Sequence, residues 1–112
     1  IFPQLLLTKG TQMIYFQWSM KRFDWDIDKN KKLIEERNIS FEEVVFFIEQ
    51  GQILDIIDNP NPKYRQQKMF VLDIAGYVYL VPFTETSESY FLKTIFPSRK
   101  ATKEYLREGE TP

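Results

Sequence analysis

The chain has 112 residues, of which 43% are hydrophobic, an amount that suits one folded domain rather than two. It contains neither cysteine nor histidine, which excludes disulfides, the usual zinc sites and nucleophile systems that depend on either residue. The formal net charge of -1 does not favour a protein that binds nucleic acid over its whole surface.

No apolar run approaches the roughly 20 residues that a membrane-spanning helix needs. The segment Leu5-Leu6-Leu7 is short, and it lacks the basic leader and the small-residue cleavage site of a signal peptide. We therefore expect a cytoplasmic protein with no membrane partner.

The segment Ile14-Tyr15-Phe16-Gln17-Trp18-Ser19-Met20 resembles a protease site of expression vectors joined to a start methionine. We interpret residues 1–19 as a remnant of an expression tag and residues 20–112 as a single domain. The alternative is a native N-terminal strand that lies on a sheet edge.

The first element of the domain alternates polar and apolar residues over 21–26, which predicts a short strand. Asp26 or Asp28 can then cap a helix that runs through Arg37, because either carboxylate could accept from free amides of the first turn. Asn38 is expected to end this helix, since asparagine tolerates the left-handed conformation.

A capping box gives the clearest local signal in the chain. Ser40 and Glu43 are spaced so that each side chain can bond the other residue's backbone amide. Ile39 and Val44 occupy the positions of a hydrophobic staple, and Gly51 is expected to end the helix. The buried face of this helix should contain Phe41, Val44, Val45 and Ile48.

Strand patterns follow from residue 53. The expected strands cover residues 53–58, 69–74, 77–83 and 90–96, with a hairpin turn at Ala75-Gly76 and a loop at 59–62. Residues 84–89 form a polar loop, and Ser98 can cap a closing helix through about Arg107.

This order predicts an α+β fold in which two helices pack on one face of a four- to five-stranded, mainly antiparallel sheet, with a C-terminal helix. Seven residues are expected to be mostly buried: Phe41, Val44, Val45, Ile48, Leu72, Ile74 and Leu80.

One acidic segment imitates the spacing of a calcium loop. Its sixth position, which needs glycine for a sharp turn, holds Lys29, so helix capping is the better interpretation and no metal site is predicted. The residues concerned are Asp24, Asp26, Asp28, Asn30 and Glu35.

The C-terminal part of the chain concentrates positive charge, with Glu104 as the only acid among five basic residues. A local phosphate site and a solvated helix face both fit this pattern. The basic residues are Lys93, Arg99, Lys100, Lys103 and Arg107.

Five short motifs lie in order along residues 20–107: Phe23-Asp24-Trp25-Asp26, Lys29-Asn30, Ile39-Ser40-Phe41-Glu42-Glu43-Val44, Ser98-Arg99-Lys100-Ala101-Thr102 and Glu104-Tyr105. Together, with their spacing, they resemble the BrnT family of bacterial toxins, in the RelE-like ribonuclease group of toxin–antitoxin systems.

The resemblance implies a type II toxin that inhibits translation by cutting RNA, either free or on the ribosome, without a metal or cofactor. It also implies a cognate antitoxin, often a ribbon-helix-helix protein. The alternative is a non-catalytic protein-binding module with a toxin-like fold, which the net charge and the missing histidine favour. A small-molecule enzyme has no supporting motif.

Without histidine, the acid and base of such a reaction must come from Glu, Lys or Tyr. Arg99 is the first candidate for phosphate, since its guanidinium can hold two oxygens and it lies at an expected helix N-terminus. Lys93 and Lys100 follow, and Tyr105 and Glu85 are weaker candidates for proton transfer.

Further RNA contacts are expected from Lys21, Arg22, Lys103 and Tyr79. Each candidate also has a structural interpretation. Arg99 could be an ordinary surface residue, Tyr105 could pack on the sheet, and Tyr79 could face the helices instead of stacking on bases.

Overall fold

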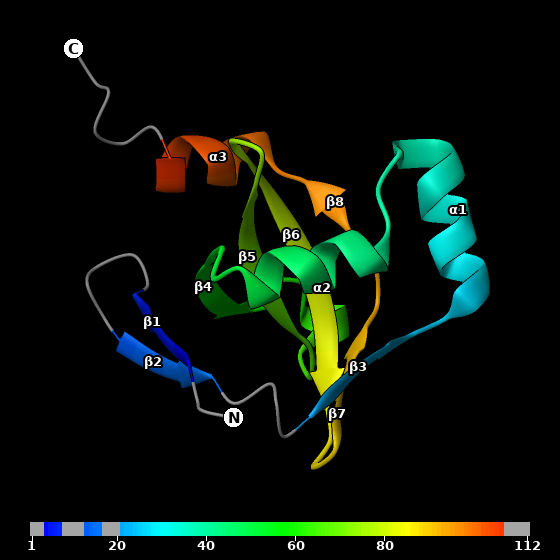
Figure 1. The fold of residues 1–112 in the computed structure, drawn as a ribbon, viewed down its shortest axis with the longest axis horizontal. Coiled ribbons are helices and arrows are strands. Elements are labelled where there is room, and N and C mark those ends of the chain that lie inside the picture. Colours follow the sequence, from blue (N-terminus) through cyan, green and yellow to red (C-terminus); the bar gives the residue numbers. More distant parts are fainter. Residues whose placement is uncertain (1–3, 8–12, 17–20, 107–112) are drawn as a thin grey trace.

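The structure is a computed structural model that describes residues 4–7, 13–16 and 21–106 (Figure 1). Two short strands, β1 (Gln4–Leu7) and β2 (Met13–Phe16), pair as a separate antiparallel two-stranded sheet. They lie in the segment interpreted as a tag remnant, and that interpretation stays a prediction. Arg107 lies outside the described residues.

The domain combines three helices with one sheet of six strands. The helices are α1 (Ile27–Arg37), α2 (Phe41–Glu49) and α3 (Arg99–Leu106), with a short 3-10 turn, η2 (Pro62–Tyr64). The strands are β3 (Arg22–Trp25), β4 (Ile53–Asp58), β5 (Lys68–Ile74), β6 (Tyr77–Glu85), β7 (Ser89–Leu92) and β8 (Phe96–Pro97).

The sheet has the order β3-β7-β6-β5-β4, with β8 paired to β6 beyond the end of β7. All pairs are antiparallel except β3 with β7. The predicted α+β class, with two helices before an antiparallel run and a closing helix, is confirmed.

The local signals for α1 act as the sequence predicts. The Asp26 carboxylate caps α1 by accepting from the amides of Asp28 and Lys29 at 2.8 and 3.1 Å. Asn38 ends the helix with a positive φ of 56°.

The signals for α2 are confirmed in the same way. The Ser40 amide donates to Glu43 at 2.9 Å, and the Glu43 amide donates to the Ser40 hydroxyl at 3.1 Å. Gly51 follows the helix with a φ of 80°, a conformation that favours glycine.

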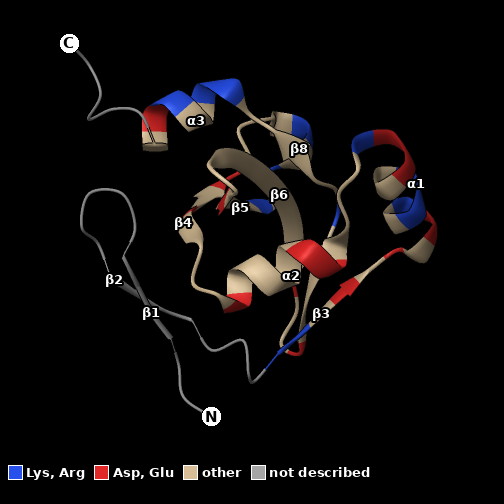
Figure 2. Ribbon diagram, turned by 45° about the horizontal axis from the view of Figure 1, so that its top comes forward, with Lys and Arg blue, Asp and Glu red and all other residues tan. Residues whose placement is uncertain are grey.

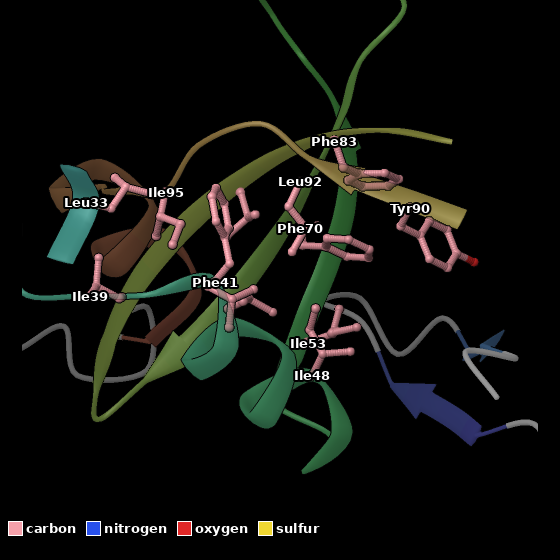
Figure 3. Close-up of a cluster of buried hydrophobic side chains, with 13 residues drawn as sticks. Leu33, Ile39, Phe41, Ile48, Ile53, Phe70, Phe83, Tyr90, Leu92 and Ile95 are labelled. Atoms are coloured by element: carbon pink, nitrogen blue, oxygen red, sulfur yellow. The ribbon is translucent and has the colours of Figure 1, made fainter. Parts of the chain in front are cut away.

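The two faces of the sheet bury different side chains. On the face that α2 covers, with Leu33 of α1 at one end of the cluster, buried residues from the helices meet Phe70, Val81 and Leu92 from the strands (Figure 3). On the other face, α3 packs over Val71 and Val78.

The burial predictions are confirmed for Phe41, Val44, Ile48 and Leu72. Val45, Ile74 and Leu80 are half-buried, and Leu80 belongs to the α3 face.

The predicted last strand, 90–96, is broken in the structure. Leu92 pairs with Phe83, whereas Phe96 pairs with Leu80, so the chain contains one extra residue between the two pairs. Such a bulge shifts the register by one and exchanges the faces of the side chains that follow. As a result Ile95 is fully buried beside α1 and α2, and Phe96 lies on the α3 face.

Candidate nucleic-acid interface

A groove lies on the α3 face of the sheet, near the end of β6 that α3 does not cover. Its first part, here called the inner pocket, has a volume of about 480 Å³ and lies between the loop 59–67 and the segment 93–96, with Pro82 of β6 between them. Its lining residues are Asn59, Asn61, Tyr64, Gln67, Pro82, Lys93, Thr94 and Phe96.

The second part of the groove, here called the outer hollow, has a volume of about 370 Å³. It shares Tyr64, Gln67 and Lys93 with the inner pocket, and it adds Lys63 and Arg65 from the same loop. The two spaces are therefore continuous around Tyr64 and Lys93.

The bulge at 93–95 places the residues of one wall. The Lys93 amide donates to the Pro82 carbonyl at 2.8 Å, which holds this end of the segment on β6. Arg37, at the end of α1, donates to the Ile95 carbonyl and holds the other end. The Lys93 ammonium lies 4.8 Å from the centre of the Phe91 ring, a cation–π distance.

The opposite wall is a loop closed by its own hydrogen bonds. The Asn61 amide donates to the Asn59 side chain at 3.0 Å, and the Lys63 amide donates to the Asn61 side chain at 3.0 Å. The Tyr64 amide donates to the Asn61 carbonyl at 2.9 Å. Tyr64, which this loop carries to the edge of the groove, is 41% exposed.

The groove is positively charged. Within the described part of the chain, the ion pairs join Lys21 to Glu85 and Arg22 to Asp24, and neither pair involves Lys63, Arg65 or Lys93. These three cations therefore have no carboxylate partner among the described residues, and they lie beside an exposed tyrosine. Sites for single-stranded nucleic acid combine positive charge and aromatic rings in this way.

Arg99 lies apart from this groove. It lines a separate hollow of about 370 Å³ with Tyr77, Thr102 and Lys103. The Ser98 amide, next to Arg99, donates to the carbonyl of Val78 in β6. Val78 lies four residues before Pro82 of the groove, so the two sites are about 13 Å apart along the strand. The structure therefore does not bring Arg99 together with Lys93.

Lys100 is exposed on α3, which carries three basic residues and one acid, whereas the start of α2 is acidic (Figure 2). Lys21 and Arg22 are held in their ion pairs, and Glu85 is the partner of Lys21. These residues lie outside the lining of the groove.

Two predicted tyrosines take structural positions. The Tyr105 hydroxyl donates to the Asp55 carboxylate at 2.8 Å, and burial together with this bond raises the pKa of Tyr105. Tyr79 packs against the α1 and α2 side of the sheet, 6.1 Å from the Tyr77 ring. Both placements agree with the packing interpretation.

Sequence reasoning missed most of the groove. Asn59, Asn61 and Tyr64 lie in a segment interpreted only as a loop. A signal was present, because Tyr64 stands between Lys63 and Arg65, and such interleaving of basic and aromatic residues favours nucleic acid. No comparable signal marked Phe96, whose position depends on the bulge.

No helix in the described residues is long and apolar enough to cross a membrane. Comparisons of the chain with protein-family models, with curated proteins and with solved structures find no match.

Proposed function

We propose that this chain is a toxin-type endoribonuclease that binds single-stranded RNA in the groove and cuts it without a metal. The observation that carries the proposal is a group of three cations beside exposed Tyr64 that have no carboxylate partner among the described residues: Lys63, Arg65 and Lys93. The resemblance to BrnT toxins supports the same function.

The groove supplies charge stabilisation and proton donation. In the proposed reaction the 2′-hydroxyl of RNA attacks the adjacent phosphorus and loses its proton to water or hydroxide. The bond from phosphorus to the 5′-oxygen breaks, and that oxygen takes a proton from the Lys93 ammonium, which then regains one from water. Lys93 and Arg65 would stabilise the added negative charge on the phosphoryl oxygens, as preorganised cations do at such sites. The products are a 2′,3′-cyclic phosphate and a 5′-hydroxyl.

The test is cleavage of a defined RNA by the purified chain in EDTA, with and without ribosomes, followed by analysis of the ends. Cyclic phosphate ends that Lys93→Ala greatly reduces and Lys100→Ala does not would support the proposal. A parent protein that leaves the RNA intact under both conditions would contradict catalysis.

A non-catalytic binding module is the second candidate. It is favoured because the described residues that line the groove include no carboxylate that could act as a general base. Binding of the same RNA without cleavage would identify this function.

We also propose a protein partner, a cognate antitoxin of the ribbon-helix-helix kind, as the resemblance implies. Support comes from Ile27 and Ile34, which are seven positions apart on one face of α1 and are 69% and 47% exposed, and from Phe46 on α2. Co-expression with the neighbouring gene product followed by gel filtration tests this partner, and separate elution would count against it.

A further inference from the structure

We infer that the inner pocket holds one unpaired RNA base and selects a base that presents carbonyl oxygens, uracil or guanine. This inference rests on the proposed RNA binding and adds the chemistry that the groove recognises. It depends on the walls of the pocket, on the orientation of two side-chain amides and on the cations at its mouth.

The walls provide surfaces on which a base can stack. Tyr64 and Phe96 come from opposite sides of the pocket, and the ring of Pro82 lies between their segments. The volume of about 480 Å³ is enough for one nucleotide. Stacking on aromatic rings tolerates any base, so these walls account for binding and not for selection.

The orientation of the amides is set by backbone donors. The Asn61 amide N–H donates to Asn59 Oδ1, so the Asn59 NH2 group faces Gln67 and donates to Gln67 Oε1 at 3.4 Å. The Gln67 NH2 group is therefore left to donate elsewhere. In the same way Asn61 Oδ1 accepts from the Lys63 amide, which leaves the Asn61 NH2 group without a partner in the described part of the chain.

These two NH2 groups and the Lys93 ammonium make the polar lining rich in donors. Uracil presents carbonyl oxygens at O2 and O4, and guanine presents O6 beside N7. Cytosine and adenine each place an amino group on the corresponding edge, and that group would meet another donor. The lining therefore favours keto bases over amino bases.

The phosphate backbone has a place beside this base. Lys93 borders both spaces, and Lys63 and Arg65 border only the outer hollow. A nucleotide with its base in the inner pocket can thus set its phosphate among these cations. The residues that attract the phosphates therefore differ from those that select the base, so mutations can change affinity and base preference separately.

The experiment measures, by fluorescence anisotropy at fixed salt, the binding of four labelled RNA heptamers of sequence CCCXCCC, in which the central base X is U, G, A or C. The parent should bind the U and G oligonucleotides roughly fivefold to tenfold more tightly than the A and C ones. Gln67→Glu keeps the acceptor for Asn59 and replaces the free donor by an acceptor, so it should abolish or reverse this preference. Gln66→Glu adds the same charge at the neighbouring position, which borders the outer hollow and not the inner pocket, so it should weaken binding of all four oligonucleotides and keep the preference.

Equal binding of all four oligonucleotides would overturn the base pocket and leave the proposed RNA groove standing, as would a preference for A or C. An unchanged preference in Gln67→Glu would also overturn the pocket. Absence of binding by all four would overturn the RNA groove and the pocket together.

Discussion

The side-chain amide of Asn30 donates a hydrogen bond of 2.7 Å to the Glu42 carboxylate and so joins the first turns of α1 and α2. The same amide accepts from the Phe41 backbone N–H at 2.8 Å, and Asn30 is only 7% exposed. A residue that imitated a calcium ligand in the sequence therefore caps the neighbouring helix.

Replacement of Asn30 by alanine should lower the free energy of unfolding by about 2–3 kcal/mol, because it leaves the buried Phe41 N–H without its acceptor. Urea denaturation measures the change. Lys31→Ala, at an exposed position of the same helix, serves as the control and should change stability by less than about 0.5 kcal/mol. Equal effects of the two variants would contradict the capping role of Asn30.

The bond from Asn30, with a smaller contribution from backbone hydrogen bonding, lowers the pKa of Glu42 in the folded protein. A carboxyl group whose folded pKa is lowered stabilises the protein above its unfolded pKa of about 4.3, and this contribution disappears as the pH falls through the folded pKa. Glu42→Gln should therefore be less stable than the parent near pH 6, and the difference should shrink below about pH 4. Glu36→Gln, whose side chain has no hydrogen bond in the described residues, is the control substitution, and urea denaturation of both variants at the two pH values measures the difference.

Thr102 connects α3 to β6, because its hydroxyl accepts from the buried Val78 N–H at 2.9 Å and donates to the Ser98 carbonyl at 2.7 Å. Thr102→Val keeps the shape and removes the acceptor, so it should cost about 1–3 kcal/mol of folding stability. Thr102→Ser keeps the hydroxyl and should cost less. Thermal or urea unfolding measures the stability of the two variants. A Thr102→Ser protein that is less stable than Thr102→Val would contradict the proposed role of the hydroxyl.

Tyr105 is expected to stabilise the fold without taking part in chemistry. Tyr105→Phe removes its hydrogen bond to Asp55 and should cost about 0.5–1.5 kcal/mol, while the rate of RNA cleavage at a temperature well below unfolding stays the same. Denaturation and cleavage are measured on the same preparation. A large loss of cleavage in a folded Tyr105→Phe protein would return Tyr105 to the candidate site.

The elements of the fold were predictable where their signals are local. Ser40 and Glu43 define the start of α2 within four residues, and Asn38 ends α1 through its own backbone preference. The bulge at 93–95 has no such signal, since it depends on pairing with β6 and on the distant Arg37.

The same limit applies to the site. Lys93 was predicted from its charge, but its neighbours Tyr64 and Phe96 come from segments 29 and 3 residues away, and only the folded sheet shows that they share a pocket. Arg99 is the first candidate from its guanidinium, its place at a helix N-terminus and its family motif, and none of these signals shows its distance from Lys93 along β6.

The central claim, that the groove around Lys93 is the RNA site, is tested most directly by single-turnover cleavage of a defined RNA in EDTA by three proteins: the parent, Lys93→Ala and Arg99→Ala. Our account predicts that Lys93→Ala lowers the rate on the order of 100-fold while the variant stays folded, since removal of one preorganised charge-stabilising donor has an effect of this size. Arg99→Ala, in the separate hollow, should stay within about threefold of the parent, because it loses only a distant contribution to phosphate attraction. A Lys93→Ala protein as active as the parent, or an Arg99→Ala protein that alone loses activity, would contradict the account.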